Sequence, residues 1–144
     1  MNILVVNGPN LNFLGKREKS IYGDKSYSDL VNYLGDYAEQ KNINIEIFQT
    51  NHEGEIIDII QNNFERFSGL IINPGAYTHY SYAIYDCLLS IDIKKVEVHL
   101  SDIYKREDFR KISVTGKACE KQIYGKGFLS YIEAIDYLIS EVNK

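Results

Sequence analysis

The feature that most constrains the fold is a regular alternation of strand-type runs with helical stripes. Apolar, β-branched runs occur at residues 3–6, 43–47, 70–72 and 96–100, with a shorter strand signal at 121–124. Between and after them, apolar residues recur at helical spacing over residues 26–38, 56–64, 83–88 and 131–142. Strands that alternate with helices along the whole chain predict a parallel sheet covered by helices on both faces.

A chain of 144 residues suits one domain, which we place at residues 1–144. Right-handed crossovers restrict the topology of a parallel sheet. With about five strands, we expect an α/β, flavodoxin-like three-layer sandwich with strand order 2-1-3-4-5. We expect no membrane association, because no apolar stretch approaches the roughly 18 residues that would span a bilayer.

The candidate site lies where the strand order reverses, beyond the carboxyl ends of the strands. Three segments reach that place: residues 7–12, residues 73–79 and residues 97–101. They bring Asn10, Asn73, His79, His99 and Ser101 toward one crevice. These side chains donate and accept hydrogen bonds, so they suit a substrate with several hydroxyl groups.

The polar segment at residues 15–23 follows the first of these loops. It is too polar and too glycine-flanked for a core element, so it is either a lid over the crevice or a solvated loop. Glu97 lies two residues before His99 on one predicted strand, so both side chains share a face and direct pairing is expected. The three histidines, His52, His79 and His99, show no paired-ligand spacing, and we expect no metal site.

Charge and cysteine content restrict the partners. The formal net charge is −4, which argues against nucleic acid as a partner. Cys87 and Cys119 are the only cysteines and form no CxxC pair. No signal peptide is evident at residues 1–6, so we expect a reducing cytoplasm.

Four motifs in order along the chain resemble those of the type II 3-dehydroquinate dehydratase family. They are Asn7-Gly8-Pro9-Asn10-Leu11-Asn12 with Leu14-Gly15, Arg17-Glu18 and Tyr22-Gly23; Gln49 with Asn51-His52-Glu53-Gly54; Ile72-Asn73-Pro74-Gly75-Ala76-Tyr77-Thr78-His79; and Glu97-Val98-His99-Leu100-Ser101 with Arg106-Glu107 and Phe109-Arg110. Together they cover nearly the whole chain and are highly specific.

The resemblance implies a flavodoxin-like fold and a homododecamer built from four trimers. It also implies anti elimination of water from 3-dehydroquinate through an enolate, giving 3-dehydroshikimate without metal or cofactor. This step belongs to the shikimate pathway toward chorismate and the aromatic amino acids; the same reaction in quinate breakdown is the alternative.

By the same resemblance, Tyr22 matches the catalytic base and His99 the general acid. Arg17 matches a lid arginine that supports the tyrosine and the transition state, Asn10 the residue that holds a water against the enolate, and Glu97 the carboxylate that orients the histidine. Free tyrosine has a pKa of about 10, so a nearby cation is needed to make a phenolate usable.

Other positions match residues that bind substrate. They are Asn73, His79, Leu100, Ser101 and Arg110, with Arg106 as a second basic lid residue and Asp86 as the residue that reaches in from a neighbouring subunit. The sequence departs from the family pattern at Lys19, Tyr80, Tyr82, Tyr85, Asp102 and Tyr104. These departures bear on the lid, substrate affinity and the subunit interface.

Three rival functions suit the same fold. A flavin- or phosphate-binding module is disfavoured because the first loop carries one glycine rather than a cradle rich in glycine and hydroxyl residues. A phosphoacceptor domain would need acidic residues at the strand ends, where this chain has asparagine and histidine. An inactive family member is disfavoured by the intact Tyr22, Arg17 and His99.

Overall fold

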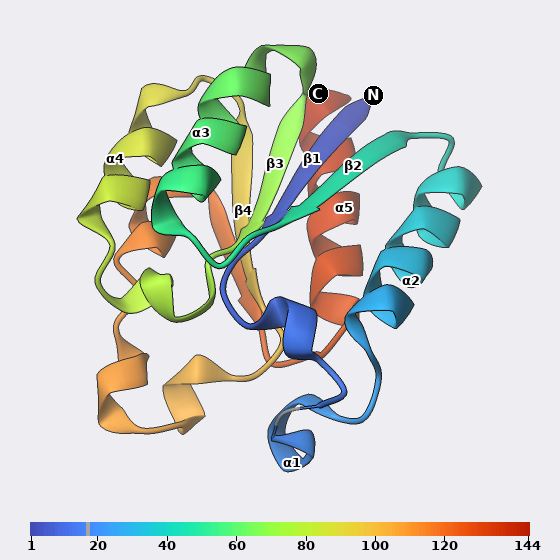
Figure 1. Cartoon of the computed structure of the whole chain (residues 1–144). Helices are drawn as coiled ribbons and strands as arrows, with labels where there is room; N and C mark the ends of the chain where they lie inside the picture. Colours follow the sequence, from blue (N-terminus) through green and yellow to red (C-terminus); the bar gives the residue numbers. More distant parts are fainter. Residues whose placement is uncertain (17) are drawn as a thin grey trace.

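The computed structural model describes residues 1–16 and 18–144, and it contains a five-stranded parallel sheet. The strands are β1 (Asn2–Asn7), β2 (Asn44–Gln49), β3 (Gly69–Asn73), β4 (Lys94–His99) and β5 (Lys121–Tyr124). They follow the order β2-β1-β3-β4-β5, and every neighbouring pair is parallel (Figure 1). The predicted fold class and strand order are therefore confirmed.

Helices cover both faces of this sheet. Helices α2 (Tyr27–Gln40) and α5 (Leu129–Val142) pack on one face, and α3 (Glu53–Asn63) and α4 (Tyr82–Ser90) on the other (Figure 1). A short helix, α1 (Lys19–Tyr22), lies beyond the carboxyl ends of the strands in Figure 1. None of the helices in residues 1–16 and 18–144 has the length and apolar character of a membrane span.

Alternation along β1 explains why its sequence is apolar at every position. Ile3 and Val5 point to the core under α2 and α5, whereas Leu4 and Val6 point to the core under α3 and α4. All four side chains are fully buried. A strand in the middle of a sheet with helices on both sides has no solvent face, so both sets of side chains are apolar.

The ends of the elements follow local signals. Ser26 and Asp29 form the expected capping box at the start of α2, since each side chain accepts a hydrogen bond from the other residue's backbone N–H. The helix expected to include Phe64 ends at Asn63, and Phe64 starts a short 3-10 turn. Strand β4 ends at His99, but Leu100 still packs in the core under α5.

Tight packing between the loops after β1 and β3 fixes the edge of the sheet where ligands are expected. The Gly8 N–H donates to the Asn73 carbonyl over 2.7 Å. A Cβ at Gly8 would lie 2.7 Å from the carbonyl carbon of Pro74, and a Cβ at Gly75, with φ +59°, would lie 3.0 Å from the carbonyl oxygen of Pro9. Only residues without a side chain allow this approach, which holds the two loops side by side.

Candidate active site

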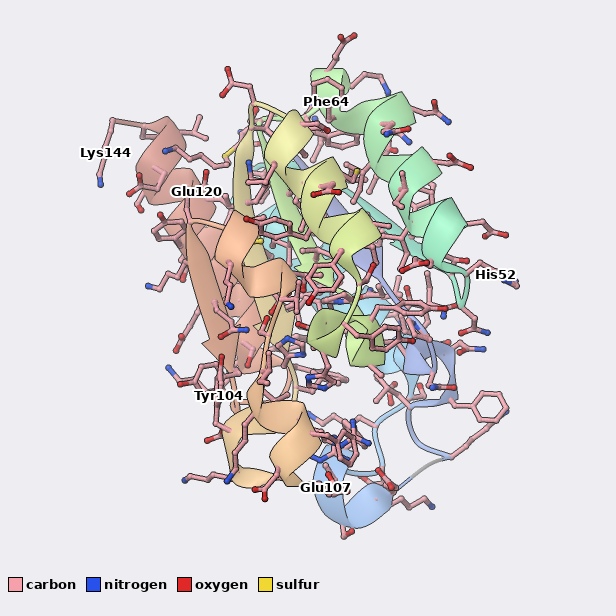
Figure 2. The ribbon with its side chains drawn as sticks, turned by 90° about the vertical axis from the view of Figure 1, so that its left-hand side faces the viewer. His52, Phe64, Tyr104, Glu107, Glu120 and Lys144 are labelled. Atoms are coloured by element: carbon pink, nitrogen blue, oxygen red, sulfur yellow. The ribbon has the colours of Figure 1, made fainter. Side chains whose placement is uncertain are left out.

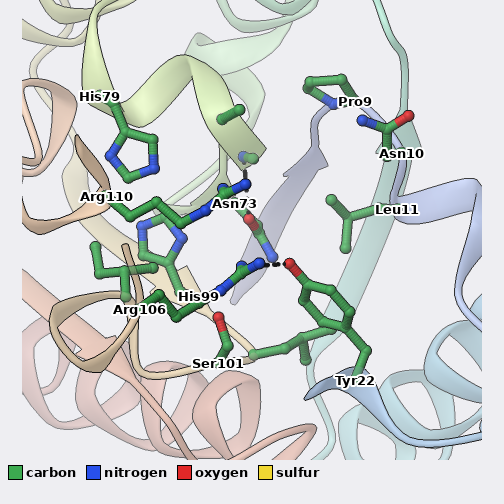
Figure 3. Close-up of a pocket in the computed structure, with 14 residues that line it drawn as sticks. Pro9, Asn10, Leu11, Tyr22, Asn73, His79, His99, Ser101, Arg106 and Arg110 are labelled. Carbon is green, nitrogen blue, oxygen red and sulfur yellow. Dashed lines mark hydrogen bonds between the residues drawn. The ribbon is translucent and has the colours of Figure 1, made fainter. Parts of the chain in front are cut away.

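A cavity of about 110 Å³ opens at the carboxyl ends of β1, β3 and β4 (Figure 3). It lies at the reversal of strand order, where the sequence predicted the site. The lining residues come from the loops after these strands, from α1 and from the segment between β4 and β5. They are Pro9, Asn10, Leu11, Tyr22, Asn73, Gly75, Ala76, His79, His99, Leu100, Ser101, Ile103, Arg106 and Arg110.

Nine of the residues predicted from the sequence line this cavity: Asn10, Tyr22, Asn73, His79, His99, Leu100, Ser101, Arg106 and Arg110. Glu97 is fully buried directly behind His99. Asp86 is exposed on α4 and is not among the lining residues, so its expected role depends on a second subunit. Arg17 lies outside the described residues.

Tyr22 enters the cavity from the end of α1 and meets a cation there. The Arg106 Nη1 donates to the Tyr22 hydroxyl oxygen over 2.6 Å, as the dashed line in Figure 3 shows. Arg106 is largely buried, and its Nη2 lies 3.4 Å from a Glu18 carboxylate oxygen. A guanidinium cannot accept a hydrogen bond, so the tyrosine oxygen is the acceptor. A fixed positive charge therefore lies directly against the Tyr22 hydroxyl.

His99 enters from the end of β4, and Glu97 lies behind it. The His99 Nε2 lies 3.0 Å from the Glu97 Oε2, and both side chains are buried. The pairing expected from their spacing on one strand is present. Glu97 therefore fixes the orientation of the imidazole ring and places a carboxylate directly against it.

Donors surround the Glu97 carboxylate. Besides His99, it accepts hydrogen bonds from the hydroxyls of Thr78, Ser113 and Thr115 and from the amide of Gln122. Burial alone would raise the pKa of Glu97. The hydrogen bonds from His99 and the hydroxyls outweigh that effect, so its pKa lies below the usual range. Glu97 is thus a carboxylate at neutral pH despite its complete burial.

His79 and Arg110 line the cavity on the side opposite Asn10 and Leu11 (Figure 3). The His79 Nδ1 donates to the Ile112 carbonyl over 2.7 Å, which leaves Nε2 as an acceptor in the neutral ring. Burial lowers the pKa of His79 and so favours that neutral form. Arg110 donates to Glu107 over 2.7 Å and places a cation at the cavity wall.

A buried polar chain supports Asn73 at the base of the cavity. Its Nδ2 donates to the Tyr131 hydroxyl over 3.0 Å, and its Oδ1 accepts from the Gly75 N–H over 3.2 Å. Tyr131 in turn donates to the Asn7 Oδ1 over 2.6 Å, and its complete burial raises its pKa. The orientation of Asn73 is fixed before any ligand arrives.

Asn10 has a left-handed backbone, with φ 71°, a conformation that asparagine tolerates better than most residues. Its N–H donates to the Asn51 Oδ1 over 3.0 Å. Gln49 donates to that same oxygen over 3.1 Å and to the Gly8 carbonyl over 3.2 Å. Through this network, residues of the second motif, which do not line the cavity, hold the backbone of Asn10 in place.

Pattern reasoning missed two groups of residues. Five lining residues supply shape rather than polar groups: Pro9, Leu11, Gly75, Ala76 and Ile103. The donors to Glu97 at positions 78, 113, 115 and 122 come from three separate segments. Ser113 and Thr115 lie in a segment with no apolar periodicity, so no signal in a single sequence identifies them.

The three histidines do not converge. His79 and His99 line the cavity, whereas His52 is exposed at the start of α3, at the edge of the molecule in Figure 2. Within residues 1–16 and 18–144, no three His, Cys, Asp or Glu side chains form a group that could hold a metal ion.

Comparison with known proteins decides the family. Residues 1–139 match the family model described as dehydroquinase class II. The chain belongs to this family. A protein named 3-dehydroquinate dehydratase from Lachnoclostridium phytofermentans is 55% identical over 141 residues, covering 97% of each chain. The resemblance found in the sequence motifs is thereby confirmed.

Solved structures of class II dehydroquinases have the same fold. The type II dehydroquinase from Butyrivibrio crossotus DSM 2876 aligns with a TM-score of 0.94 and 58% identity, over 96% of this chain and 97% of that chain. The type II dehydroquinase from Propionibacterium acnes aligns with a TM-score of 0.92 and 38% identity, over 96% of both chains. The relatives' names describe a hydro-lyase, the enzyme class expected from the sequence.

Proposed function

We propose that this chain is a type II 3-dehydroquinate dehydratase that removes water from 3-dehydroquinate in the shikimate pathway. Membership of the class II dehydroquinase family supports this function. The observation that carries the mechanism is that Tyr22, bonded to Arg106, and His99, bonded to Glu97, line one cavity. One pair can take a proton and the other can give one.

Tyr22 is the proposed base. It removes a proton from the carbon next to the substrate ketone, and the electron pair moves onto the ketone oxygen as an enolate. Arg106 stabilises the phenolate that must exist before this step, since the two groups are 2.6 Å apart. By family resemblance, Arg17 adds a second cation. Asn10 holds a water against the enolate oxygen and so stabilises the intermediate.

His99 is the proposed acid. The enolate collapses back to the ketone and expels the hydroxyl group, which takes a proton from His99 and leaves as water. Glu97 stabilises the protonated imidazole before this transfer and keeps its ring in place. Atoms balance, because the carbon-bound proton goes to Tyr22 and the leaving hydroxide gains the proton of His99.

The remaining cavity residues bind the substrate in this proposal. Arg110 and the backbone at Leu100 and Ser101 bind the carboxylate and hydroxyl groups, and neutral His79 accepts a hydrogen bond through Nε2. Asn73 is held rigid by Tyr131 and contacts the substrate at the base of the cavity.

The assembly completes the site in our proposal. Asp86 is exposed on α4, close in sequence to Tyr80, Tyr82 and Leu89, whose side chains are 57–70% exposed. An apolar surface of this kind suits a subunit interface. We propose a trimer in which Asp86 reaches the neighbouring cavity, four such trimers forming a cytoplasmic homododecamer. Analytical ultracentrifugation of the native chain and of Tyr82→Glu tests this, since a monomeric native protein contradicts it.

Ultraviolet absorbance tests the reaction directly. The product is a conjugated enone carboxylate and absorbs where the substrate does not. Native protein mixed with 3-dehydroquinate should give a rise in absorbance, with or without a chelator. Tyr22→Phe should abolish the rise, whereas Tyr33→Phe, on the exposed face of α2, should retain it. A folded native protein that gives no rise contradicts the proposed function.

A further inference from the structure

A chain of hydrogen bonds runs from the protein surface to His99. The Tyr104 hydroxyl lies 2.5 Å from the Gln122 Oε1, and the Gln122 Nε2 donates to the Glu97 Oε2 over 2.6 Å. The same Glu97 oxygen contacts His99 at 3.0 Å. Tyr104 lies on the segment between β4 and β5, where Figure 2 labels it, and is partly exposed.

The sheet register places Gln122 against Glu97. The two residues are direct partners across the parallel pair β4–β5, so their side chains leave the sheet on the same face. Glu97 is also the partner of Ile72, whose side chain packs under α3 and α4. Backbone pairing rather than side-chain flexibility therefore brings the amide to the carboxylate.

Charge fixes which end of the Gln122 amide faces inward. If the amide were reversed, its Oε1 would lie against the Glu97 carboxylate oxygen, and two acceptors would repel each other. With Nε2 inward, Oε1 points outward and accepts the Tyr104 O–H. Tyr104 therefore locks the orientation that Glu97 requires.

Gln122 competes with His99 for a single carboxylate oxygen. Both donate to Oε2, which also accepts from the hydroxyls of Thr78 at 3.0 Å and Ser113 at 2.7 Å. The Gln122 contact, at 2.6 Å, is the shortest of the four. Each donor withdraws negative charge from the oxygen it contacts. The strength of the Glu97–His99 interaction thus depends on how firmly Gln122 is held.

Gln122 and Tyr104 also separate Glu97 from solvent. They line a hollow of about 380 Å³ that shares no lining residue with the cavity, together with Lys111, Ile112, Ser113, Gly116 and Lys117. Without the Gln122 amide, water in this hollow would have a route to the buried carboxylate.

We propose that Gln122 and Tyr104 are positioning residues that set the direction and the effective charge of Glu97 toward His99. The proposal rests on the proposed function for its catalytic consequence.

Several other groups influence His99 and remain unchanged in the test. Among the described residues, Tyr22 from α1, His79 from the loop after β3, and Arg106 and Arg110 from the segment after β4 line the same cavity. Because native and variant proteins both contain these four residues, a difference in the pH dependence of kcat between them arises from the Gln122–Tyr104 pair.

The test uses Gln122→Met, which keeps length without the amide, and Tyr104→Phe, which keeps the ring without the hydroxyl. Gln61→Met on α3 and Tyr33→Phe on α2 are matched exposed controls. The dependence of kcat on pH is measured for each protein. In parallel, the ring signals of ¹³C-labelled histidine are followed by NMR against pH without substrate, with His52→Gln and His79→Gln used for assignment.

We expect Gln122→Met to move the alkaline limb of kcat and the His99 titration midpoint upward by about one pH unit, the size of one hydrogen bond to a charged group. The reason is that Oε2 then carries more negative charge toward His99. Tyr104→Phe should move both in the same direction by less, and KM and the controls should stay unchanged.

Two results would overturn the proposal. One is an unchanged His99 titration midpoint in both variants. The other is a fall in kcat that is equal at every pH, which would indicate a structural role alone. A native protein without turnover would contradict the proposed function, but the NMR titration would still decide the positioning role. Tyr104→Phe, which preserves shape, answers the question if Gln122→Met does not fold.

Discussion

Replacing Gly116 with alanine tests the packing around Glu97. A Cβ at this position would lie 2.7 Å from the Ser113 Oγ, 2.9 Å from the Gln122 Nε2 and 2.9 Å from the Glu97 Oε2. All three distances are shorter than side-chain carbons normally tolerate. The φ angle of Gly116 is not positive, so the expected effect is steric and not a matter of backbone strain.

The expected cost follows from overpacking a buried site. Forcing an extra methyl group into a well-packed core destabilises a protein by about 1–3 kcal/mol. For a chain of this size, that corresponds to a fall in Tm of roughly 2–12 °C. If the displaced Glu97 loses about 1.4 kcal/mol of its interaction with His99, kcat falls about tenfold.

Substitution of a second glycine is a control that should change the free energy of unfolding in the opposite direction. Gly35 lies inside α2, and a Cβ there would meet nothing within 4 Å. Gly35→Ala should therefore raise the free energy of unfolding by about 0.8–1.0 kcal/mol through helix propensity, with kcat unchanged. Both variants are compared with the native chain by urea unfolding at one protein concentration, because assembly also affects stability. Equal stability of Gly116→Ala and the native protein would refute the packing argument.

Three further predictions concern the site and the thiols. Arg106→Met should lower kcat at least about tenfold, because it removes a charged hydrogen bond, worth about 1.5–3 kcal/mol, to the Tyr22 oxygen. An unchanged kcat would show that Arg106 does not act on the tyrosine. Glu97→Gln should lower kcat at least tenfold, the equivalent of a charged hydrogen bond of about 1.5–3 kcal/mol. Because the folded-state pKa of Glu97 is depressed, the stability that this carboxylate contributes is present above about pH 4.5 and is lost at lower pH. The free energies of urea unfolding of the native protein and Glu97→Gln should therefore converge on acidification. A difference that stays constant with pH would contradict this. Burial raises the pKa of Cys87 and Cys119, so neither thiol should react with a disulfide reagent at pH 8 until the chain is unfolded; rapid reaction of the folded protein would count against their burial.

Much of the fold was predictable because the sheet is buried on both faces. In β1 and β3, a side chain that points either way meets a helix, so the strands read as continuous apolar runs. A helix between two successive strands connects them in parallel, and right-handed crossovers leave few possible strand orders for such a sheet. The start of α2 was predictable because its signal is local: Ser26 and Asp29, which form the capping box, both lie within four consecutive residues.

The pairing of Tyr22 with Arg106 shows where pattern reasoning ends. The two residues are 84 positions apart and belong to segments without apolar periodicity. The sequence placed Tyr22 in a polar segment that was either a lid or a solvated loop, and the structure turns its last residues into α1, with Tyr22 at the cavity. Strand ends can be located from periodicity, but contacts between two irregular segments depend on the path of each loop.

The surroundings of Glu97 join stability to catalysis. A buried carboxylate is costly unless hydrogen bonds stabilise its charge, and here hydroxyls, an amide and a histidine all do so. Because so many donors approach one group, no room remains at Gly116 for even a methyl group. The same donors limit how much charge Glu97 offers His99. A substitution that frees Glu97 would therefore strengthen its hold on the histidine while weakening the fold, and the two effects can be separated only by comparing pH profiles with unfolding free energies.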